Sequence, residues 1–500
     1  MRGISKRFGD VQALDSVDLE VEAGTIHAVV GENGAGKTTL MRALYGAMTV
    51  YSGSMEVEGR KVSFAKSAEA IAAGIGMVSQ HYGIIPELTC LQNLILGAEG
   101  GAVIDLAGAR RRASSLAARM GFEFDWDADA AALSPAGAQK LEILKLLWRD
   151  ARIMILDEPT AMLSPADGEA LFASLSQLVA EGATVILVTH RLPEVMEHCK
   201  RVTVLRAGKR VEEKLVADTN AAELARLIVG GEVVQPVARD YEISSEEVIR
   251  VSSLTVRGSR GDEALKSVSF SLRGRELVGI AGVDGSGQRE LFYALSGMAT
   301  PVSGSIEFLS EAEDRTARSD KTYASVADRL KAGLRIIPED RHAEGVVEDW
   351  SLEENASLGL QRLAPFARGG SVDARARREE AGKIASRFAT KHGGLGNAMA
   401  SLSGGNQQRF VAARALELSP RLILAFQPAR GLDLNATEHV YQGLREACKA
   451  GAAALVVSFD LDELLEHCDR LLVLNRGVMT EPAPGLEKDR EAVGRLMVGA

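Results

Sequence analysis

Short apolar runs alternate with amphipathic stretches along both halves of the chain. In the first half the apolar runs are TIHAVV, RIMILDEP and ATVILVTH, and TIHAVV is followed by the helical pattern KTTLMRALYG. Apolar strand-like runs separated by longer helical patterns are typical of βαβ units. The pattern therefore predicts an α/β fold with a mainly parallel core sheet, whose ligands lie at the carboxyl ends of the strands.

The chain also contains an internal repeat that covers most of its length. ALDSVDLEVEAG (13–24) aligns with ALKSVSFSLRGR (264–275), 251 residues further on. AAGIGMVSQH (72–81) aligns with KAGLRIIPED (331–340), an offset of 259, and LSPAGAQK (133–140) aligns with LSGGNQQR (402–409), an offset of 269. Offsets that grow in small steps indicate two copies of one domain, with a few insertions in the second copy.

The repeat divides the chain into a first domain at 1–235, a linker at 236–246 and a second domain at 247–500. The join, QPVARDYEISSEE, is short, polar and contains a proline, as expected of a linker. Val248–Leu254 predicts a strand at the start of the second copy, whereas Met1 begins just inside its equivalent. We therefore expect the first copy to lack its first strand or to start late.

The first copy carries a complete phosphate-binding motif, GENGAGKT, at residues 31–38. It fits G-x-x-x-x-G-K-[ST] and lies between a predicted strand and a predicted helix, as this motif requires. Backbone N–H groups of such a loop surround the β-phosphate, its lysine reaches the β- and γ-phosphates, and its hydroxyl binds Mg²⁺. We predict that ATP is bound by Gly31, Glu32, Asn33, Gly34, Ala35, Gly36, Lys37, Thr38 and Thr39.

Two further apolar runs end in polar residues that suit phosphate chemistry. Asp157 and Glu158 follow IMIL, where the first carboxylate can hold Mg²⁺ through water and the second can polarise a water aimed at the γ-phosphate. His190 ends ATVILVTH, where its imidazole can contact the γ-phosphate, and Gln80 ends GMVSQ. A lone histidine or glutamine after a strand is usually structural, so these two gain weight only as part of the set.

The ordered set of phosphate loop, Gln80, LS motif, LDEPT and His190, repeated twice, resembles ATP-binding-cassette ATPases over essentially the whole chain. The resemblance implies two tandem P-loop cassettes, each with a mainly parallel core sheet, an antiparallel β subdomain and a helical subdomain. It also implies that Phe8 stacks on adenine and that Gln80 serves both catalysis and Mg²⁺, beside Thr38 and Asp157 at the metal. The expected activity is hydrolysis of ATP to ADP and phosphate, coupled to solute translocation.

In this family two cassettes pair head to tail, so each ATP lies between one phosphate loop and the other cassette's LSGGQ-type signature. The resemblance thus pairs the first loop with LSGGN in the second copy. There a helix start faces the γ-phosphate and favours negative charge. The residues implied in this contact are Ser403, Gly404, Gly405 and Asn406.

The other head-to-tail pairing joins the second phosphate loop to the first signature, and both of these motifs have lost expected residues. In the second loop, GVDGSGQRE (282–290), Gln288 and Arg289 replace the lysine and the hydroxyl residue. In the first signature, LSPAG (133–137), Pro135 and Ala136 replace two glycines, which removes a donor and crowds the backbone. The second-copy positions equivalent to Asp157, Glu158 and His190 hold Phe426, Gln427 and Phe459. We predict one hydrolysing site per chain; whether the other site holds nucleotide is left open.

The composition of the chain limits the classes of partner that it can bind. A formal charge of −10 and a pI near 5.5 disfavour nucleic acid, and the four cysteines lie far apart, as reduced thiols of a cytosolic protein would. No run of about 18 apolar residues occurs, and MRGISKRFGD is no signal peptide, so we expect a soluble chain. A transport role then requires two integral membrane permease subunits and, indirectly, an extracytoplasmic solute-binding protein. The chain would lie peripherally on the cytoplasmic face of the plasma (inner) membrane.

Fused twin cassettes with a defective second copy resemble importers of simple sugars and nucleosides. PEDRHAEGVV, LSGGNQQR and AFQPARGLD resemble the nucleoside (basic-membrane-lipoprotein-linked) branch most, because the sugar branch more often keeps the second DEPT. Import of a sugar such as ribose or galactose is the alternative. A twin-cassette protein acting on ribosomes or DNA, and a regulatory ATP-binding protein without turnover, are the competing classes.

Overall fold

In the computed structural model the chain forms two compact units, Met1–Val233 and Val234–Ala500. The structure describes residues 1–9, 11–50, 52–79, 83–98, 104–133, 135–160, 163, 165–232, 234, 239–258, 261–309, 318–368 and 370–499. Gln80, Ser134 and Ser259 lie outside the described residues, as does the side chain of Pro135.

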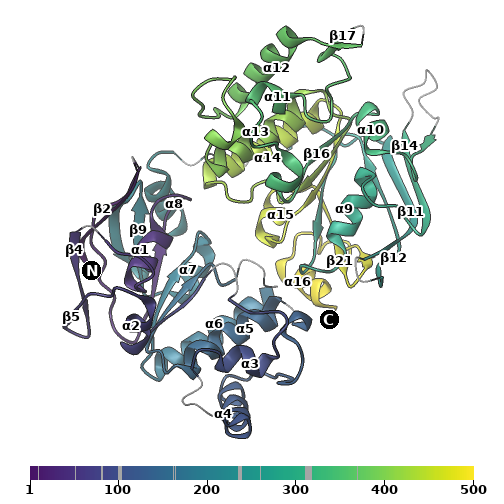
Figure 1. Ribbon diagram of the computed structural model, residues 1–500. Coiled ribbons are helices and arrows are strands. Elements are labelled where there is room, and N and C mark those ends of the chain that lie inside the picture. The colour runs from purple at the N-terminus through teal and green to yellow at the C-terminus, as the bar shows by residue number, and fades with distance from the viewer. Residues whose placement is uncertain are drawn as a thin grey trace. The chain divides into compact units, whose positions relative to one another are not determined.

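The core of the first unit, which runs from purple to teal in Figure 1, is a six-stranded sheet with the order β10-β9-β3-β8-β7-β6. All its neighbouring strands are parallel except the pair β10–β9. Every residue of β3 and β8 is buried, as is typical of the mainly apolar central strands of a parallel sheet. The strands are β3 Ile26–Val30, β6 Ile75–Val78, β7 Ile153–Asp157, β8 Thr184–Val188, β9 Arg201–Arg206 and β10 Lys209–Leu215. The predicted α/β fold with a parallel core is confirmed.

A four-stranded sheet with the order β2-β1-β4-β5 forms the second layer of strands in this unit. Its strands are β1 Arg2–Phe8, β2 Val11–Val17, β4 Ser52–Val57 and β5 Arg60–Val62. β1 pairs antiparallel with both β2 and β4, just as β11 (Glu247–Arg257) pairs with β12 and β14 in the second unit. The first strand is therefore present, and the expectation that it is missing was wrong. It has seven residues where β11 has eleven.

The helices of the first unit pack on the parallel sheet or form a separate helical subdomain. They are α1 Lys37–Leu44, α2 Ser67–Ala72, α3 Cys90–Ile95, α4 Leu106–Arg119, α5 Pro135–Trp148, α6 Pro165–Ala180, α7 Leu192–His198 and α8 Ala221–Val229, with 3₁₀ turns Ala130–Ala132 and Val216–Asp218. α1 buries Leu40, Met41 and Leu44, the apolar positions at helical spacing. α3 starts with a capping box, in which Thr89 and Gln92 satisfy each other's backbone N–H groups.

The second unit repeats this plan. Its six-stranded sheet has the order β16-β19-β20-β13-β21-β22, its antiparallel sheet has the order β12-β11-β14-β15, and β17 pairs with β18. The strands are β12 Glu263–Arg273, β13 Leu277–Ala281, β14 Ser303–Leu309, β15 Arg318–Asp320, β16 Leu334–Ile337, β17 Ala367–Arg368, β18 Ser371–Val372, β19 Leu422–Phe426, β20 Ala453–Val457, β21 Arg470–Asn475 and β22 Val478–Thr480.

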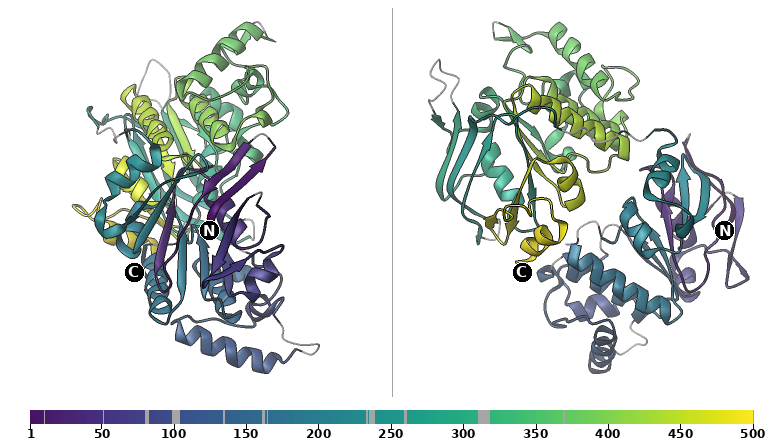
Figure 2. Two further views of the ribbon diagram at one scale, coloured as in Figure 1. Left: turned by 90° about the vertical axis from the view of Figure 1, so that its left-hand side faces the viewer. Right: turned by 180° about the vertical axis from the view of Figure 1, so that it is seen from behind.

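Its helices again cover the parallel sheet, and α13 packs against α14 (Figure 2). They are α9 Gln288–Ser296, α10 Val326–Lys331, α11 Leu352–Ala356, α12 Ala374–Arg387, α13 Gly404–Glu417, α14 Leu434–Lys449, α15 Leu461–His467 and α16 Arg490–Val498, with a π-helical turn at Arg341–Gly345 and a 3₁₀ turn at Met399–Ser401. None of the helices in the described part of the chain is long and apolar enough to cross a membrane.

A buried asparagine shows how closely the two units correspond. The Asn93 side-chain amide donates to the carbonyl oxygens of Ile85, Leu88 and Thr89. Asn355 makes the same three bonds, 262 residues further on, to Val347, Trp350 and Ser351. Each side chain satisfies a turn whose backbone groups would otherwise be buried without partners. The structural repeat therefore includes the helical subdomain.

Candidate active site

The phosphate-binding motif forms a loop between β3 and α1. Gly34 and Gly36 have φ of 84° and 102°, a region that favours glycine. The loop also passes close to other backbone: a Cβ on Gly31 would lie 2.2 Å from the Leu205 carbonyl oxygen, and one on Gly36 would lie 2.7 Å from that of Ala13. These glycines are therefore required by geometry, and the loop opens toward the N-terminus of α1, where negative charge is favoured.

Lys37 places its ammonium group inside this loop. Its Nζ lies 2.6 Å from the Gly31 carbonyl oxygen and 3.1 Å from that of Glu32. Burial lowers the pKa of Lys37, and the nearby carboxylates of Glu158 and Asp157 counteract that effect. A buried cation inside this loop matches the charge of a nucleotide's terminal phosphates.

Thr38 and Asp157 come together at the start of α1. Thr38 Oγ1 donates to Asp157 Oδ2 at 3.0 Å, although the residues are 119 positions apart. Burial raises the pKa of Asp157, while the Thr38 hydroxyl acts in the opposite direction. Hydroxyl and carboxylate oxygens are ligands that Mg²⁺ prefers, so the residues at this point fit Mg²⁺. Gln80, the third predicted ligand, is outside the described residues.

Glu158 and His190 form the other half of the site. His190 Nδ1 lies 3.0 Å from Glu158 Oε1, and Glu158 has the left-handed φ of 50° just after β7. Burial raises the pKa of Glu158, but the hydrogen bond to His190 together with the charges of His190, Lys37 and Arg191 outweighs it, so the net shift is downward. Glu158 is thus a carboxylate at neutral pH, which a group that accepts a proton from water must be.

The other predicted nucleotide contacts lie at the edges of the loop. Phe8 ends β1 with 49% of its surface exposed, and Lys6 Nζ lies 5.4 Å from its ring centroid. Asn33 is exposed at the tip of the loop, and Thr39 lies in the first turn of α1. An exposed ring at a strand end is available for stacking on a base.

The predicted signature residues belong to the second unit, so the structure places them with their own helix. Ser403 caps α13, and Asn406 Nδ2 donates to Ser403 Oγ at 2.9 Å. Gly404 and Gly405 form the first turn of the helix. Asn406 Oδ1 also accepts from the Lys391 N–H at 2.9 Å. The described geometry therefore brings together residues 31–39, 157, 158 and 190, and separately residues 403–406.

Comparison with known proteins identifies the family. The profile of the ABC transporter family matches residues 14–161 and 265–429. The chain belongs to the ABC transporter family. It is an ATPase subunit that binds ATP, and its two units are called the first and second cassette below.

Three similar proteins illustrate the range of this family. The chain is 36% identical to the nucleoside import ATP-binding protein NupA of Lactococcus lactis, covering 100% of this chain and 97% of that protein. It is also 36% identical to the ribose import ATP-binding protein RbsA 1 of Streptomyces avermitilis, covering 100% and 93%. A crystal structure of an archaeal ribosome recycling factor in complex with a ribosomal stalk protein matches 94% of this chain and 87% of that one, with a TM-score of 0.64 and 19% identity. That last likeness shows the fold alone.

The second cassette keeps the backbone of the phosphate loop and loses its side chains. Gly282, Gly285 and Gly287 have φ of 158°, 84° and 110°, against 157°, 84° and 102° in the first cassette. Gln288, at the position of Lys37, is buried and donates through Nε2 to the Val283 carbonyl oxygen at 3.0 Å. The loop shape is therefore set by its glycines and not by the lysine.

Arg289, at the position of Thr38, forms an ion pair that sequence reasoning missed. Its Nε and one Nη lie 2.6 and 2.8 Å from the two oxygens of Glu339, and another Nη lies 3.1 Å from Asp284 Oδ1. The Glu339 carboxylate raises the pKa of Arg289. Glu339 aligns with Gln80 at the offset of 259. The alignment therefore contained the signal: two of the three positions predicted to bind Mg²⁺ had changed to residues of opposite charge.

Aromatic rings occupy two of the equivalent positions in the second cassette. Phe426 makes edge-to-face contacts with Phe292 at 5.5 Å and Phe459 at 5.9 Å between ring centroids. Phe426 and Phe459 occupy the positions of Asp157 and His190. An apolar cluster offers no ligand to Mg²⁺ and no acceptor for a proton.

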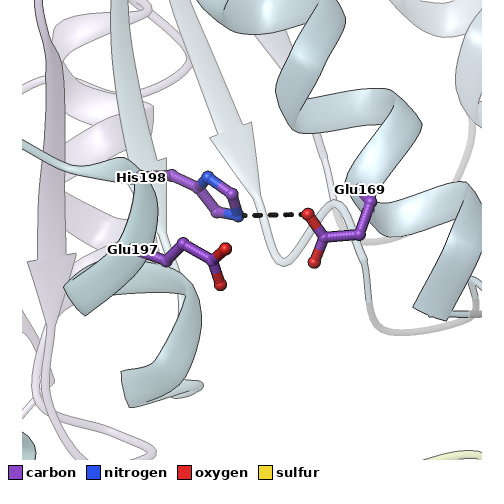
Figure 3. Close-up of side chains that lie close together, drawn as sticks. All are labelled: Glu169, Glu197 and His198. Carbon is purple, nitrogen blue, oxygen red and sulfur yellow. Dashed lines mark ion pairs between the residues drawn. The ribbon is translucent and has the colours of Figure 1, made fainter. Parts of the chain in front are cut away.

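A further charged group recurs in both cassettes away from the phosphate loops. Figure 3 shows Glu169 on α6 and Glu197 and His198 on α7, with His198 Nε2 3.9 Å from Glu169 Oε2. The group repeats 269 residues further on, where His467 Nε2 lies 3.4 Å from Glu438 Oε1. Each imidazole stacks on an aromatic ring, Phe172 or Tyr441, at 4.0 Å. These contacts hold two neighbouring helices together in each cassette.

Proposed function

We propose that the first cassette hydrolyses ATP and that this hydrolysis powers the import of a small polar solute. One observation carries the proposal: the charged Glu158 carboxylate is held by His190 beside Asp157, Thr38 and a complete phosphate loop. Each of these groups has a role that phosphoryl transfer needs, namely charge neutralisation, metal binding and proton acceptance.

The residues act in one displacement. The loop N–H groups and Lys37 hold the phosphates and neutralise their charge. Glu158 accepts a proton from the attacking water while the water oxygen forms a bond to the γ-phosphorus. The bond between the γ-phosphorus and the β,γ-bridging oxygen breaks, which leaves ADP and phosphate. Thr38 and Asp157 would hold Mg²⁺, with Gln80 as a third ligand; bound there, the ion neutralises charge that develops on the phosphates.

The second cassette does not hydrolyse ATP in this proposal. Its metal positions carry the Arg289–Glu339 ion pair and Phe426, and its base position carries Gln427, an amide that cannot accept the proton. The first phosphate loop is completed by the second signature, at Ser403–Asn406, in keeping with the head-to-tail pairing that the family resemblance implies. One ATP is hydrolysed per dimerised chain in each cycle.

In this proposal ATP hydrolysis drives solute import through separate membrane permease subunits. The first cassette contains a cavity of about 360 Å³ lined by Ser79 and Gly83, which flank residues 80–82, together with Arg42, Tyr45, Lys145 and Arg149. We place the docking of a permease subunit at this cavity, because it connects the segment next to the metal site with the helical subdomain. Two permease subunits, and through them an extracytoplasmic solute-binding protein, are the partners; the chain lies peripherally on the cytoplasmic face of the membrane.

The solute we favour is a nucleoside. The nucleoside and ribose relatives are equally similar, at 36% identity each, so they do not choose between the two solutes. The choice rests on AFQPARGLD, where the second cassette lacks the DEPT sequence that sugar importers more often keep. A simple sugar is the second candidate.

Glu158→Gln tests both the proposed ATP hydrolysis and the identity of the imported solute. ATP hydrolysis by the assembled transporter and uptake of a labelled panel of nucleosides and monosaccharides are measured for the variant and the wild type. Glu58→Gln is a matched control, since Glu58 is exposed and has the same φ of 50°. Loss of hydrolysis and of nucleoside uptake in Glu158→Gln alone supports the proposal. Loss of sugar uptake instead would change the solute, and substantial hydrolysis remaining in Glu158→Gln would refute the site.

A further inference from the structure

The Arg289–Glu339 ion pair of the second phosphate loop is connected to the second signature through a short segment of chain. Glu339, which Arg289 grips with two hydrogen bonds, lies directly after β16 with only 17% of its side chain exposed. Two residues further on, Arg341 Nε donates to Gln407 Oε1 of α13 at 3.3 Å. A Cβ added to Gly404 would lie 2.6 Å from an Nη of Arg341, so the guanidinium lies against the first turn of the signature helix. The short segment 339–341 thus contacts both the second phosphate loop and the start of the signature helix.

Two other side chains hold the same segment. Tyr293 of α9 donates through its hydroxyl to Glu344 Oε1 at 2.7 Å. Arg414 of α13 is buried and donates to the carbonyl oxygens of Asn355 and Gly345 at 2.9 and 2.8 Å. The π-helical turn Arg341–Gly345 is therefore fixed from α9 on one side and from α13 on the other, within one cassette.

The first cassette carries other residues at three of these positions, and its residues 80–82, which align with the start of this segment, lie outside the described part of the chain. Thr38 and Arg42 occupy the positions of Arg289 and Tyr293, and Lys145 occupies that of Arg414 and donates to the Gly83 carbonyl oxygen at 2.8 Å. The offset grows from 259 at Gln80 to 262 at Asn93, so the second cassette has 262 − 259 = 3 extra residues in this segment. The extra residues fall where the π-helical turn reaches the signature helix. By sequence, therefore, the Arg289–Glu339 pair belongs to the cassette whose signature is nearly intact.

We propose that Arg289 is a positioning residue for the ATP bound at the first cassette: through Glu339 and Arg341 it fixes the start of the signature helix at Ser403–Asn406. The second phosphate loop thus supports the signature Ser403–Asn406, which completes the ATP site of the first cassette. The inference rests on the proposed function, because it needs the second signature to complete the first site. Rigidly held groups lose less free energy on binding, so loosening the support weakens the contact with the γ-phosphate.

Arg289→Ala, Glu339→Ala and the double variant test this in the assembled transporter. We expect each single variant to lower kcat/KM for ATP about tenfold, and the double variant to be no worse than the singles, because directly coupled residues are not additive. Hydrogen–deuterium exchange at residues 403–408 rises in all three. Arg250→Ala is the matched control, since Arg250 pairs with Glu247 through two hydrogen bonds of 2.9 Å on β11.

Arg289→Lys covers the case in which the alanine variants fail to fold. Lysine keeps the charge but loses the two-pronged geometry, so we expect exchange at 403–408 and kcat/KM between those of the wild type and Glu339→Ala. Unchanged kcat/KM and unchanged exchange at 403–408 in Arg289→Lys and the alanine variants would overturn the inference. Glu158→Gln, run in parallel, separates the two proposals: if it does not abolish hydrolysis, the proposed function fails as well.

Discussion

Glu158 and Gln427 have the same left-handed backbone conformation, with φ of 50° and 49°, at the ends of the equivalent strands β7 and β19. The N–H of each donates to the neighbouring strand, to the Val188 carbonyl oxygen at 2.8 Å and to that of Val457 at 2.7 Å. A positive φ costs a non-glycine residue about 1–2 kcal/mol, so both cassettes maintain a strained turn. The second cassette has kept the backbone geometry of this turn, while its side chain is an amide instead of a carboxylate.

We therefore expect single reversions in the second cassette to restore nothing. Gln427→Glu supplies a carboxylate, but Phe426 still offers no metal ligand and Arg289 still pairs with Glu339. Gln288→Lys likewise supplies only one of several missing groups. ATPase rates of both variants in a Glu158→Gln background should remain at the level of Glu158→Gln alone. A measurable gain from either variant would show that the second site is one residue from activity.

Metal binding should reveal one site per chain. With a non-hydrolysable ATP analogue, electron paramagnetic resonance should count one tightly bound Mn²⁺, because the second cassette carries a guanidinium and an aromatic ring in place of metal ligands. Asp157→Asn should weaken this binding about 10–100-fold, the usual effect of removing a carboxylate that supports a metal site. Asp150→Asn, an exposed carboxylate on the same cassette, should leave it unchanged. Two Mn²⁺ ions per chain would contradict the asymmetry.

Two glycines of one loop should respond differently to alanine. Gly34 and Gly36 both have a positive φ, so each substitution costs about 1–2 kcal/mol from the backbone alone. Among the described residues no atom lies within 4 Å of a Cβ on Gly34, whereas one on Gly36 would lie 2.7 Å from the Ala13 carbonyl oxygen. We expect Gly36→Ala to lower the unfolding free energy of the first cassette by about 1–3 kcal/mol more than Gly34→Ala. Denaturant unfolding measures both; equal losses would mean that the loop moves away at no cost.

The first cassette should lose stability in mild acid because of His27. This residue lies in the central strand β3, its Nε2 is 2.8 Å from Thr203 Oγ1, and its buried Nδ1 has no hydrogen-bond partner among the residues that the structure describes. Burial lowers its pKa from 6.5 to about 4. The folded state therefore binds fewer protons than the unfolded state between these values, so this stability is present above pH 6.5 and is lost as the pH falls toward 4.

The shift corresponds to about 3 kcal/mol in total, of which about 2 kcal/mol should be lost by pH 5. Urea unfolding of the first cassette at pH 7 and pH 5 measures this difference. His27→Gln removes the titrating group, so its pH 7 to pH 5 difference should be smaller than that of the wild type, whatever its stability at pH 7. An identical difference in the two proteins would assign the acid sensitivity to other groups.

The sequence by itself determined the fold and the duplication, and it predicted the residues of the first site. Apolar runs at strand length, a loop with a fixed glycine and lysine spacing, and a carboxylate pair after a strand are local patterns, and local patterns can be found in sequence. The same reasoning located the defects at Gln288, Arg289, Phe426 and Gln427. It was wrong about a missing first strand, because a shorter strand, β1, fulfils the same pairing.

Only the tertiary structure decided which side chains meet. Thr38 contacts Asp157 across 119 residues, and His190 contacts Glu158 across 32. Arg289 reaches Glu339 because parallel strands bring the helix after β13 and the segment after β16 to the same edge of the sheet. That contact turns an apparent loss, a phosphate loop without its lysine, into a support for the signature helix. Such pairings depend on the order of strands in the sheet and on side-chain geometry, which no local sequence pattern specifies.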